Sequence, residues 1–315
     1  MILKSEELWN ATVMASSIPL SQTDFIDCAG IAWPPSSFPI IPAREGNSSL
    51  FFPKDGDGFR AGKIEWEALC ISVFVSKNNL FSKNQVLAIE LGASAAPWAL
   101  TFVKHVLAST NNYVNTIAIE AGNVKKITRL FWSRNDLKFK KITGLSRFTF
   151  KGERFKSVFL RGVATNKSGK MFFPKVDISK DNGAAGAEEL SQLDRRGKIR
   201  INRVRAIDTL NLIQAQVEVS LLHMDVQGAE VGIMQDPRFG AAIQKVQVLL
   251  IGTHSVLADE LAEDLDGKHG LTLIAGSRMK TGGSNGEWPV DGEFLFINEE
   301  VKKILIESGI LQLEH

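Results

Sequence analysis

The chain lacks several features that mark specialised classes of protein. It has only two cysteines, Cys28 and Cys70, so it offers neither a disulfide framework nor the cysteine spacing of a zinc site. No apolar run approaches the ~18 residues of a membrane-spanning helix, and the first residues lack the continuous apolar stretch of a signal peptide. We therefore expect a soluble, cytoplasmic protein that makes no membrane contact.

An excess of charge of one sign is also missing. The sequence has 37 Lys and Arg against 35 Asp and Glu, a net charge of +2, which indicates no general affinity for nucleic acid. The stretch from Lys138 to Lys156 is an exception, because basic residues alternate there with four phenylalanines. Such a pattern can contact phosphates and stack on bases, but a solvated flap over a few buried aromatic side chains is the commoner outcome. We expect the flap and no nucleic-acid partner.

Proline is scarce outside the N-terminal region, where six of the ten prolines lie before residue 60. Residues 1–62 are predicted to form a mostly irregular cap, because apolar residues are too frequent there for a disordered tail. Strands are expected at 86–90, 114–120, 158–164, 204–207, 219–225, 246–253, 271–275 and 293–298, with helices near 64–75, 98–109, 124–132, 209–216 and 258–265. This alternation predicts an α/β fold over 63–315, built on a doubly wound, mostly parallel Rossmann-like sheet.

The segment from Val86 to Trp98 is the first that carries chemistry. Its apolar strand ends in Glu90, turns at Gly92 and leads into a helix, and a second apolar strand ends in Glu120, 30 residues after Glu90. This is the layout of the first βαβ unit of a nucleotide-binding sheet. The glycine permits a tight turn close to the ligand, and the second acid can bind two ribose hydroxyls. The pattern predicts an adenosine-containing cofactor.

A second segment runs from Leu221 to Glu230, where an apolar strand delivers Asp225 at its carboxyl end. Ligands of open α/β sheets bind beyond the carboxyl ends of the strands, so Asp225 should face the crevice, with His223 on the same side one step deeper. The strand that begins at Val246 leads in the same way to His254. Two imidazoles and a carboxylate are plausible metal ligands, but their spacing is not that of a recognised metal motif, so no metal is predicted.

In these segments the chain resembles the FkbM-like methyltransferases, which are class I enzymes that use S-adenosyl-L-methionine. The matching pieces agree in order and spacing from about residue 63 to 298: Glu65-Trp66, Ile89 to Ala93 with Trp98, Ile119-Glu120-Ala121, Ala206 to Leu210, Leu222 to Glu230, Ile251 to Ser255, and Asp291-Gly292-Glu293 with Asn298. The resemblance implies methyl transfer, most often to a hydroxyl of a sugar or another small natural product, with S-adenosyl-L-homocysteine as the product.

The resemblance also implies roles for the site residues. The residues expected to contact the cofactor are Glu90, Gly92, Ala93, Ser94, Glu120, Ala121 and Asp225. An alcohol is a weak nucleophile at neutral pH, so a positioned base would assist its deprotonation. His254 is the first candidate for that base, Asp225 would orient it or the acceptor, and His223 is a further candidate that fits a core position better. The glycine-rich loop at 281–286 and the N-terminal cap are the expected lids.

One departure from the family concerns the first loop, where Ser94 and Ala96 stand at the places of its second and third glycines. Their Cβ atoms restrict the turn or crowd the methionine moiety. Two alternatives therefore stay open. One is a degenerate binding module that keeps the fold without catalysis. The other is an NAD(P)-dependent oxidoreductase, which would use a similar first βαβ unit but is disfavoured by the missing glycines and by the segment from Asp225 to Glu230.

Overall fold

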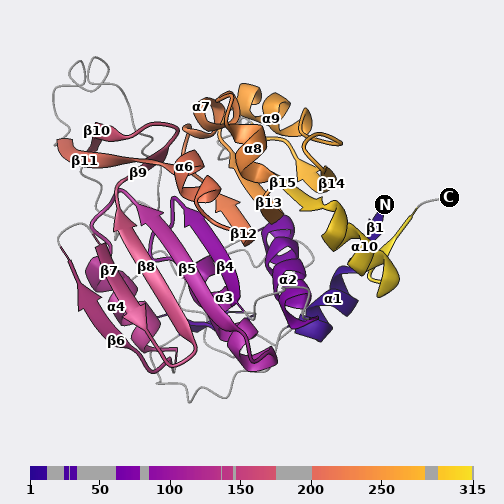
Figure 1. Ribbon diagram of the computed structural model, residues 1–315, viewed down its shortest axis with the longest axis horizontal. Coiled ribbons are helices and arrows are strands. Elements are labelled where there is room, and N and C mark those ends of the chain that lie inside the picture. The colour runs from indigo at the N-terminus through magenta and orange to yellow at the C-terminus, as the bar shows by residue number, and fades with distance from the viewer. Residues whose placement is uncertain are drawn as a thin grey trace, which may run out of the picture.

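A nine-stranded sheet forms the centre of the described structure (Figure 1). The structure is a computed structural model that describes residues 1–12, 25–27, 29–33, 62–78, 85–135, 137–144, 147–174, 201–280 and 290–313. The predicted lid loop at 281–286 and most of the predicted N-terminal cap lie outside these residues. Among the described helices, none combines the length and the apolar character needed to cross a bilayer.

Five parallel strands make up the middle of this sheet. They are β4 (Gln85–Leu91), β5 (Tyr113–Glu120), β8 (Phe155–Arg161), β12 (Val219–Met224) and β13 (Val246–Thr253). Their order is β13-β12-β4-β5-β8, and each neighbouring pair is parallel. All six residues of β12 are buried, as expected for a strand covered on both faces. Because the order reverses between β4 and β12, the sheet is doubly wound, and the predicted Rossmann-like α/β fold is confirmed.

Both edges of the sheet are antiparallel, so the sheet is less uniformly parallel than predicted. On one side β15 (Gly292–Asn298) lies between β13 and β14 (Leu271–Ser277) and is antiparallel to both. On the other side β7 (Arg147–Lys151) pairs antiparallel with β8 and with the edge strand β6 (Lys140–Thr143).

The prediction of a solvated flap at 138–156 was wrong, because this stretch supplies β6 and β7. Phe148 and Phe150 are buried, and Phe150 lies 5.4 Å from the Trp132 ring between ring centroids. Phe148 stacks on Phe159 of β8 at 4.4 Å. Burying these rings stabilises the strands enough to hold the basic residues on the surface of the sheet edge.

Helices cover both faces of the sheet. One face carries α1 (Ser5–Thr12), α2 (Lys63–Lys77), α3 (Pro97–Ser109), α4 (Lys125–Ser133) and α10 (Glu299–Glu307), and the other carries α6 (Thr209–Gln214), α7 (Glu230–Met234), α8 (Phe239–Ile243) and α9 (Val256–Glu263). Each face has its own apolar core, because alternate residues of the strands point to opposite sides. The result is a three-layer sandwich.

The first twelve residues are more regular than the predicted cap. β1 (Ile2–Leu3) pairs with β16 (Leu311–Gln312), and α1 buries Leu8 and Trp9 in the core beside α2. A short hairpin of β2 (Phe25–Ile26) and β3 (Ala32–Trp33) follows. The first twelve residues therefore pack against α2 and pair with the last strand of the described chain.

A small second sheet consists of β9 (Val163–Thr165), β10 (Gly169–Pro174) and β11 (Ile201–Asp208). It lies beyond the carboxyl ends of β5 and β8 (Figure 1), the edge at which doubly wound sheets bind their ligands.

Candidate functional site

The site is built around the point where β4 and β12 separate. These strands are neighbours in the sheet, and the chain leaves β4 toward α3 on one face but leaves β12 toward α7 on the other. The Asp225 amide donates to the Leu91 carbonyl at 3.1 Å, which holds the two exits together. Gly92 has φ +77°, and a Cβ there would lie 1.6 Å from the Asp225 carbonyl oxygen. Only glycine fits at this position.

The loop after Gly92 keeps a glycine-type backbone although two of its residues are not glycine. Ser94 and Ala96 have φ of 44° and 58°, in the left-handed region that L-residues rarely adopt. The amides of Gly92 and Ala93 donate to the Ile119 carbonyl at 3.0 and 2.9 Å, which fixes the loop on the end of β5. The Ser94/Ala96 departure therefore leaves the course of the loop intact and places strain in it.

Glu120, the last residue of β5, closes this loop from the other side. Its carboxylate accepts the Ser94 amide at 2.8 Å and the Gly122 amide at 2.6 Å, one on each oxygen. Burial raises the pKa of Glu120, the two amides act to lower it, and the nearby charge of Asp225 adds to the increase. A carboxylate can accept about four hydrogen bonds, and the Ala121 amide acts on this one as well, so Glu120 keeps acceptor capacity for a ligand hydroxyl.

Glu90 and Ala121 have structural partners that account for their burial. The Glu90 carboxylate accepts the amides of Trp98 at 3.3 Å and Ala99 at 2.8 Å, which satisfies the first turn of α3 and places a negative charge at its N-terminus. Ala121 packs in an apolar cluster with Val163 and Val204. Both residues support the loop and β5 end that the sequence assigns to the cofactor.

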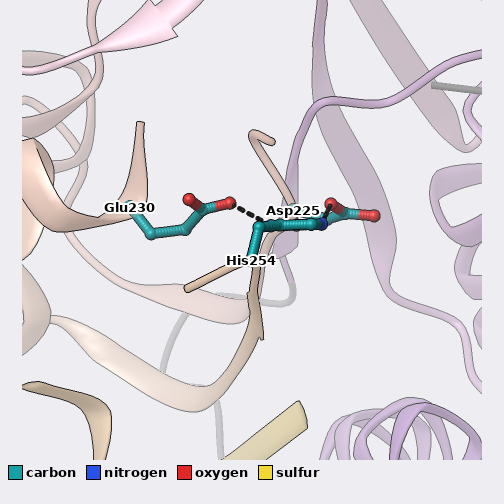
Figure 2. A group of neighbouring side chains, drawn as sticks. All are labelled: Asp225, Glu230 and His254. Atoms are coloured by element: carbon teal, nitrogen blue, oxygen red, sulfur yellow. Dashed lines mark hydrogen bonds and ion pairs between the residues drawn. The ribbon is translucent and has the colours of Figure 1, made fainter. Parts of the chain in front are cut away.

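The ring of His254, which follows β13, lies between two carboxylates (Figure 2). One belongs to Asp225, which follows β12, and the other to Glu230, the first residue of α7. Its Nδ1 lies 2.8 Å from the Glu230 carboxylate, and its Nε2 lies 3.3 Å from Asp225 on the opposite side of the ring. Glu230 is fully buried and also accepts the amides of Val226 and Gly228 at 3.0 and 2.7 Å. These bonds fix the carboxylate, and the carboxylate fixes the ring.

The electrostatics of this group follow from the number of acids around the ring. Burial alone would lower the pKa of His254, but the carboxylates of Asp225, Asp291 and Glu230 outweigh it and raise the pKa to about 12. Burial would raise the pKa of Asp225, yet the imidazoles of His254 and His223 bring it below its ordinary value. At neutral pH the ring is therefore an imidazolium between carboxylates.

Further acids gather beside His254 that the sequence-based site did not include. Asp291 Oδ2 lies 3.5 Å from His254 Nε2, and its side chain is 60% exposed. Burial, together with the charges of Asp225 and Asp291, raises the pKa of Glu293 to about 7, and Glu293 shares a hydrogen bond with Glu65 of α2. A signal for these residues existed, since Glu65 and the Asp291 to Glu293 segment belong to the matching pieces of the family resemblance.

His223 lies under this acidic group and within the core. It is 5% exposed, its ring meets Trp98 edge to face at 5.7 Å between centroids, and its Nε2 lies 3.8 Å from Glu65. Trp98 in turn contacts Trp66 at 5.1 Å. His223 and Trp98 thus form an aromatic floor that joins α2 and α3 to β12.

The predicted residues therefore fall into two adjoining groups. Gly92, Ser94 and Glu120 form the first, at the ends of β4 and β5, and Asp225 and His254 form the second, at the ends of β12 and β13. The contact between Gly92 and the Asp225 carbonyl joins them. The donors and acceptors of the first group suit a ribose, and the second group offers charged groups at the neighbouring strand ends.

Comparisons with known proteins give a fold-level likeness. No protein-family model matches the chain, and a search of curated proteins finds no match either, so the FkbM-like assignment remains a prediction that rests on its motifs. Among solved structures the chain is similar to Trm1 from Pyrococcus horikoshii in complex with S-adenosyl-L-methionine, at 8% identity and a TM-score of 0.34, covering 76% of this chain. The chain spans 57% of the length of that protein.

Two other solved structures resemble the chain to a similar degree. One is a putative RNA methyltransferase from Pyrococcus horikoshii, with 9% identity and a TM-score of 0.31, where the alignment covers 74% of this chain and 85% of the other. The other is a precorrin-6y C5,15-methyltransferase from Geobacter metallireducens, with 13% identity, a TM-score of 0.30, and coverage of 77% and 94%.

Proposed function

We propose that the protein is an S-adenosyl-L-methionine-dependent methyltransferase of the class I, FkbM-like type. The observation that carries this proposal is the first loop, which keeps left-handed backbone at Ser94 and Ala96 and is tied to the acid at the end of β5. A chain that had lost its ligand would have little reason to retain this strain. The family resemblance supplies the identity of the cofactor.

The described residues fit that cofactor in three respects. Gly92 allows the backbone to pass close to the exit of β12, where any Cβ would collide. Glu120 keeps acceptor capacity beyond its backbone amides, which suits ribose hydroxyls. The acids around Asp225 provide negative charge for the amino group and sulfonium of the cofactor.

When bound, the cofactor supplies a methyl group on a sulfonium. The acceptor oxygen forms a bond to the methyl carbon, the carbon–sulfur bond breaks, and its electron pair stays on sulfur. The task of the protein is to align these atoms and exclude water. We propose that the acceptor hydroxyl lies between Asp225 and His254 and gives its proton to the Asp225 carboxylate. The His254 imidazolium holds Asp225 and the acceptor in place.

This assignment changes the roles expected from the sequence. His254 is expected there to be the base, but an imidazole with a pKa of about 12 already carries its proton at neutral pH. Asp225 is ionised and its side chain is 37% exposed, so it can meet an acceptor. If binding of the positively charged sulfonium removed the proton from His254, the ring could again act as the base that the sequence predicts.

A hydroxyl of a sugar or another small natural product is the acceptor that the resemblance implies. The surface charge favours a second candidate, an RNA acceptor. Between residues 125 and 161 the sequence has twelve Lys or Arg and two acids, a net charge of +10, so the remainder of the chain carries −8. Lys141 lies close enough to Arg129 and Lys125 that their charges act with desolvation to lower its pKa. Lysines on an edge strand such as β6 also prevent pairing with the edge of another sheet. The contribution of Lys140 and Lys141 to RNA binding is therefore tested directly.

The two acceptors are separated by one experiment with a labelled methyl donor. The purified chain is incubated with a panel of hydroxylated small molecules and with total RNA, and label is counted in each fraction. A variant with Lys140→Glu and Lys141→Glu serves as the matched control, because it reverses charge on β6 far from the switch point. Label in small molecules, unchanged in this variant, supports the first acceptor, and label in RNA that the variant loses supports the second. Label in neither fraction, despite tight cofactor binding, contradicts the catalytic proposal.

A further inference from the structure

The ring of His254 is positioned in the way that a metal-binding histidine usually is. Its Nδ1 is held at 2.8 Å by Glu230, a carboxylate that is itself fixed by two backbone amides. A carboxylate behind a histidine fixes the tautomer and the direction of the ring and raises its strength as a ligand. The arrangement leaves the other nitrogen, Nε2, directed toward Asp225 and Asp291.

The distances on the Nε2 side are too long for the hydrogen bonds of a charged pair. Nε2 lies 3.3 Å from Asp225 Oδ1 and 3.5 Å from Asp291 Oδ2, and this buried nitrogen has no hydrogen bond of acceptable geometry within the described part of the chain. Charge-assisted bonds of this type measure ~2.7–2.9 Å. Two ligands that each lie ~2.0–2.2 Å from one ion in tetrahedral or octahedral geometry are separated by roughly 3.0–3.5 Å. The two spacings from Nε2 fall in this range, and Asp225, Glu230 and His254 have ligand atoms that all lie within 4.8 Å of one another.

The charge of the group also requires a cation. Asp225, Glu230 and Asp291 surround one imidazole, and none of the three has a Lys or Arg partner among the residues that the structure describes. Asp225 and Asp291 have side chains that are 37% and 60% exposed, so solvent can reach the space between them. In the cation-free protein a proton on the ring supplies part of the missing positive charge.

We propose that His254 Nε2, Asp225 and Asp291 bind a divalent transition-metal cation, with Glu230 as the buried acid that positions the ring. Two carboxylates and an imidazole suit Mn²⁺ better than Mg²⁺, because Mg²⁺ takes oxygen ligands and keeps its waters. A cation bound there would replace the proton on His254 Nε2 and, in place of the imidazolium, would orient the acceptor hydroxyl beside Asp225. The inference rests on the geometry of these four side chains and does not require the methyltransferase proposal.

The test is a titration of the full chain with MnCl₂, after dialysis against EDTA and then into metal-free buffer, followed by calorimetry and by the electron paramagnetic resonance signal of free Mn²⁺. We expect saturable binding of one Mn²⁺ per chain, with release of the His254 proton. Asp291→Asn should weaken binding at least tenfold, and its side chain is exposed, so the substitution leaves the packing of the core unchanged. Asp264→Asn is the matched control, because Asp264 is an exposed acid that pairs with Lys268, and it should leave the affinity unchanged.

Several results would overturn the inference. These are no saturable binding, equal binding by wild type and the Asp291 variant, or an equal loss in the Asp264 variant. A parallel titration with S-adenosyl-L-homocysteine separates this inference from the proposed function. Mn²⁺ binding without cofactor binding supports the cation site and contradicts the methyltransferase proposal. Cofactor binding without Mn²⁺ binding contradicts the cation site and supports the methyltransferase proposal.

Discussion

The strain in the first loop can be measured by glycine substitutions at three consecutive positions. Ser94 and Ala96 have positive φ, whereas Ala95 between them does not, and both alanines are fully buried. Ala95→Gly and Ala96→Gly each remove one buried methyl group and give the unfolded chain the same extra freedom. They differ in the backbone conformation that the native state imposes, so their comparison isolates that cost.

The expected changes in the free energy of unfolding combine two costs that both variants share with the backbone strain that only Ala96→Gly relieves. Loss of the methyl costs about 0.8 kcal/mol, and the added freedom of the unfolded chain costs about 0.4–1 kcal/mol. Ala95→Gly should therefore destabilise by about 1–2 kcal/mol. Ala96→Gly recovers about 1–2 kcal/mol by relieving a left-handed alanine, so it should be close to neutral. Ser94 is half-buried, and Ser94→Gly should stabilise by about 0.5–1 kcal/mol.

Urea unfolding followed by circular dichroism measures these differences directly. The Ser94→Gly/Ala96→Gly double variant should also bind S-adenosyl-L-homocysteine as well as wild type or better, because its loop takes the required course without strain. If Ala96→Gly is as destabilising as Ala95→Gly, the left-handed backbone carries no cost and the reasoning fails. If the double variant weakens binding, the loop is organised differently from the family's.

Four further results are expected. Glu120→Ala should weaken S-adenosyl-L-homocysteine binding by about 1–3 kcal/mol, as measured by calorimetry, and an unchanged affinity would rule out the ribose role. Gly92→Ala should cost roughly 3 kcal/mol or more in urea unfolding, because its Cβ meets the Asp225 carbonyl at 1.6 Å; a stable variant would mean that the two strand exits separate easily. His254→Gln should lower single-turnover methyl transfer with cofactor affinity unchanged, because the imidazolium no longer holds Asp225 and the acceptor in place, whereas loss of cofactor binding would make the ring structural. Burial raises the pKa of the Cys70 thiol from 9.0 to about 12, so the native state keeps a proton that the unfolded chain releases. Stability should then fall by about 1.4 kcal/mol per pH unit above pH 9, and a Cys70→Ala variant with the same slope would contradict this.

The strand ends of the first βαβ unit are predictable from the sequence. Glu90, Gly92 and Glu120 each follow or end an apolar run, and the backbone alone brings such positions to one edge of a parallel sheet. The left-handed conformations of Ser94 and Ala96 have the same origin. The end of β4 and the start of α3 determine the path of the loop, and its own residues adapt to that path. For this reason the departure in glycine content was a poor guide to the shape of the loop.

The acidic group around His254 was harder to predict, because it depends on where the last strand enters the sheet. β15 lies beside β13 and antiparallel to it, with Gly292 opposite Thr253 in the register. The beginning of an antiparallel strand lies at the carboxyl ends of the parallel strands. Asp291 is thereby carried to His254 although 37 residues separate them in sequence. A sequence pattern predicts where strands lie along the chain, but it does not predict that β15 pairs with β13 in the sheet.

The direction of individual side chains was also beyond the sequence. Glu90 is the penultimate residue of β4, and its carboxylate accepts the amides of Trp98 and Ala99, a direction that the strand pattern does not give. The basic stretch at 138–156 was misjudged for a related reason, since its phenylalanines pack on Trp132 of α4, which lies outside the stretch.

The central claim is that the crevice at the ends of β4 and β5 binds S-adenosyl-L-methionine. Isothermal titration of the full chain with S-adenosyl-L-homocysteine and, separately, with NAD⁺ tests it most directly, with Glu120→Ala as the variant that reports the position of the ligand. We expect one S-adenosyl-L-homocysteine per chain, an affinity that falls by about 1–3 kcal/mol in the variant, and no heat with NAD⁺. Binding of NAD⁺ in its place would indicate an oxidoreductase, and binding of neither ligand would indicate a Rossmann-like module without this cofactor.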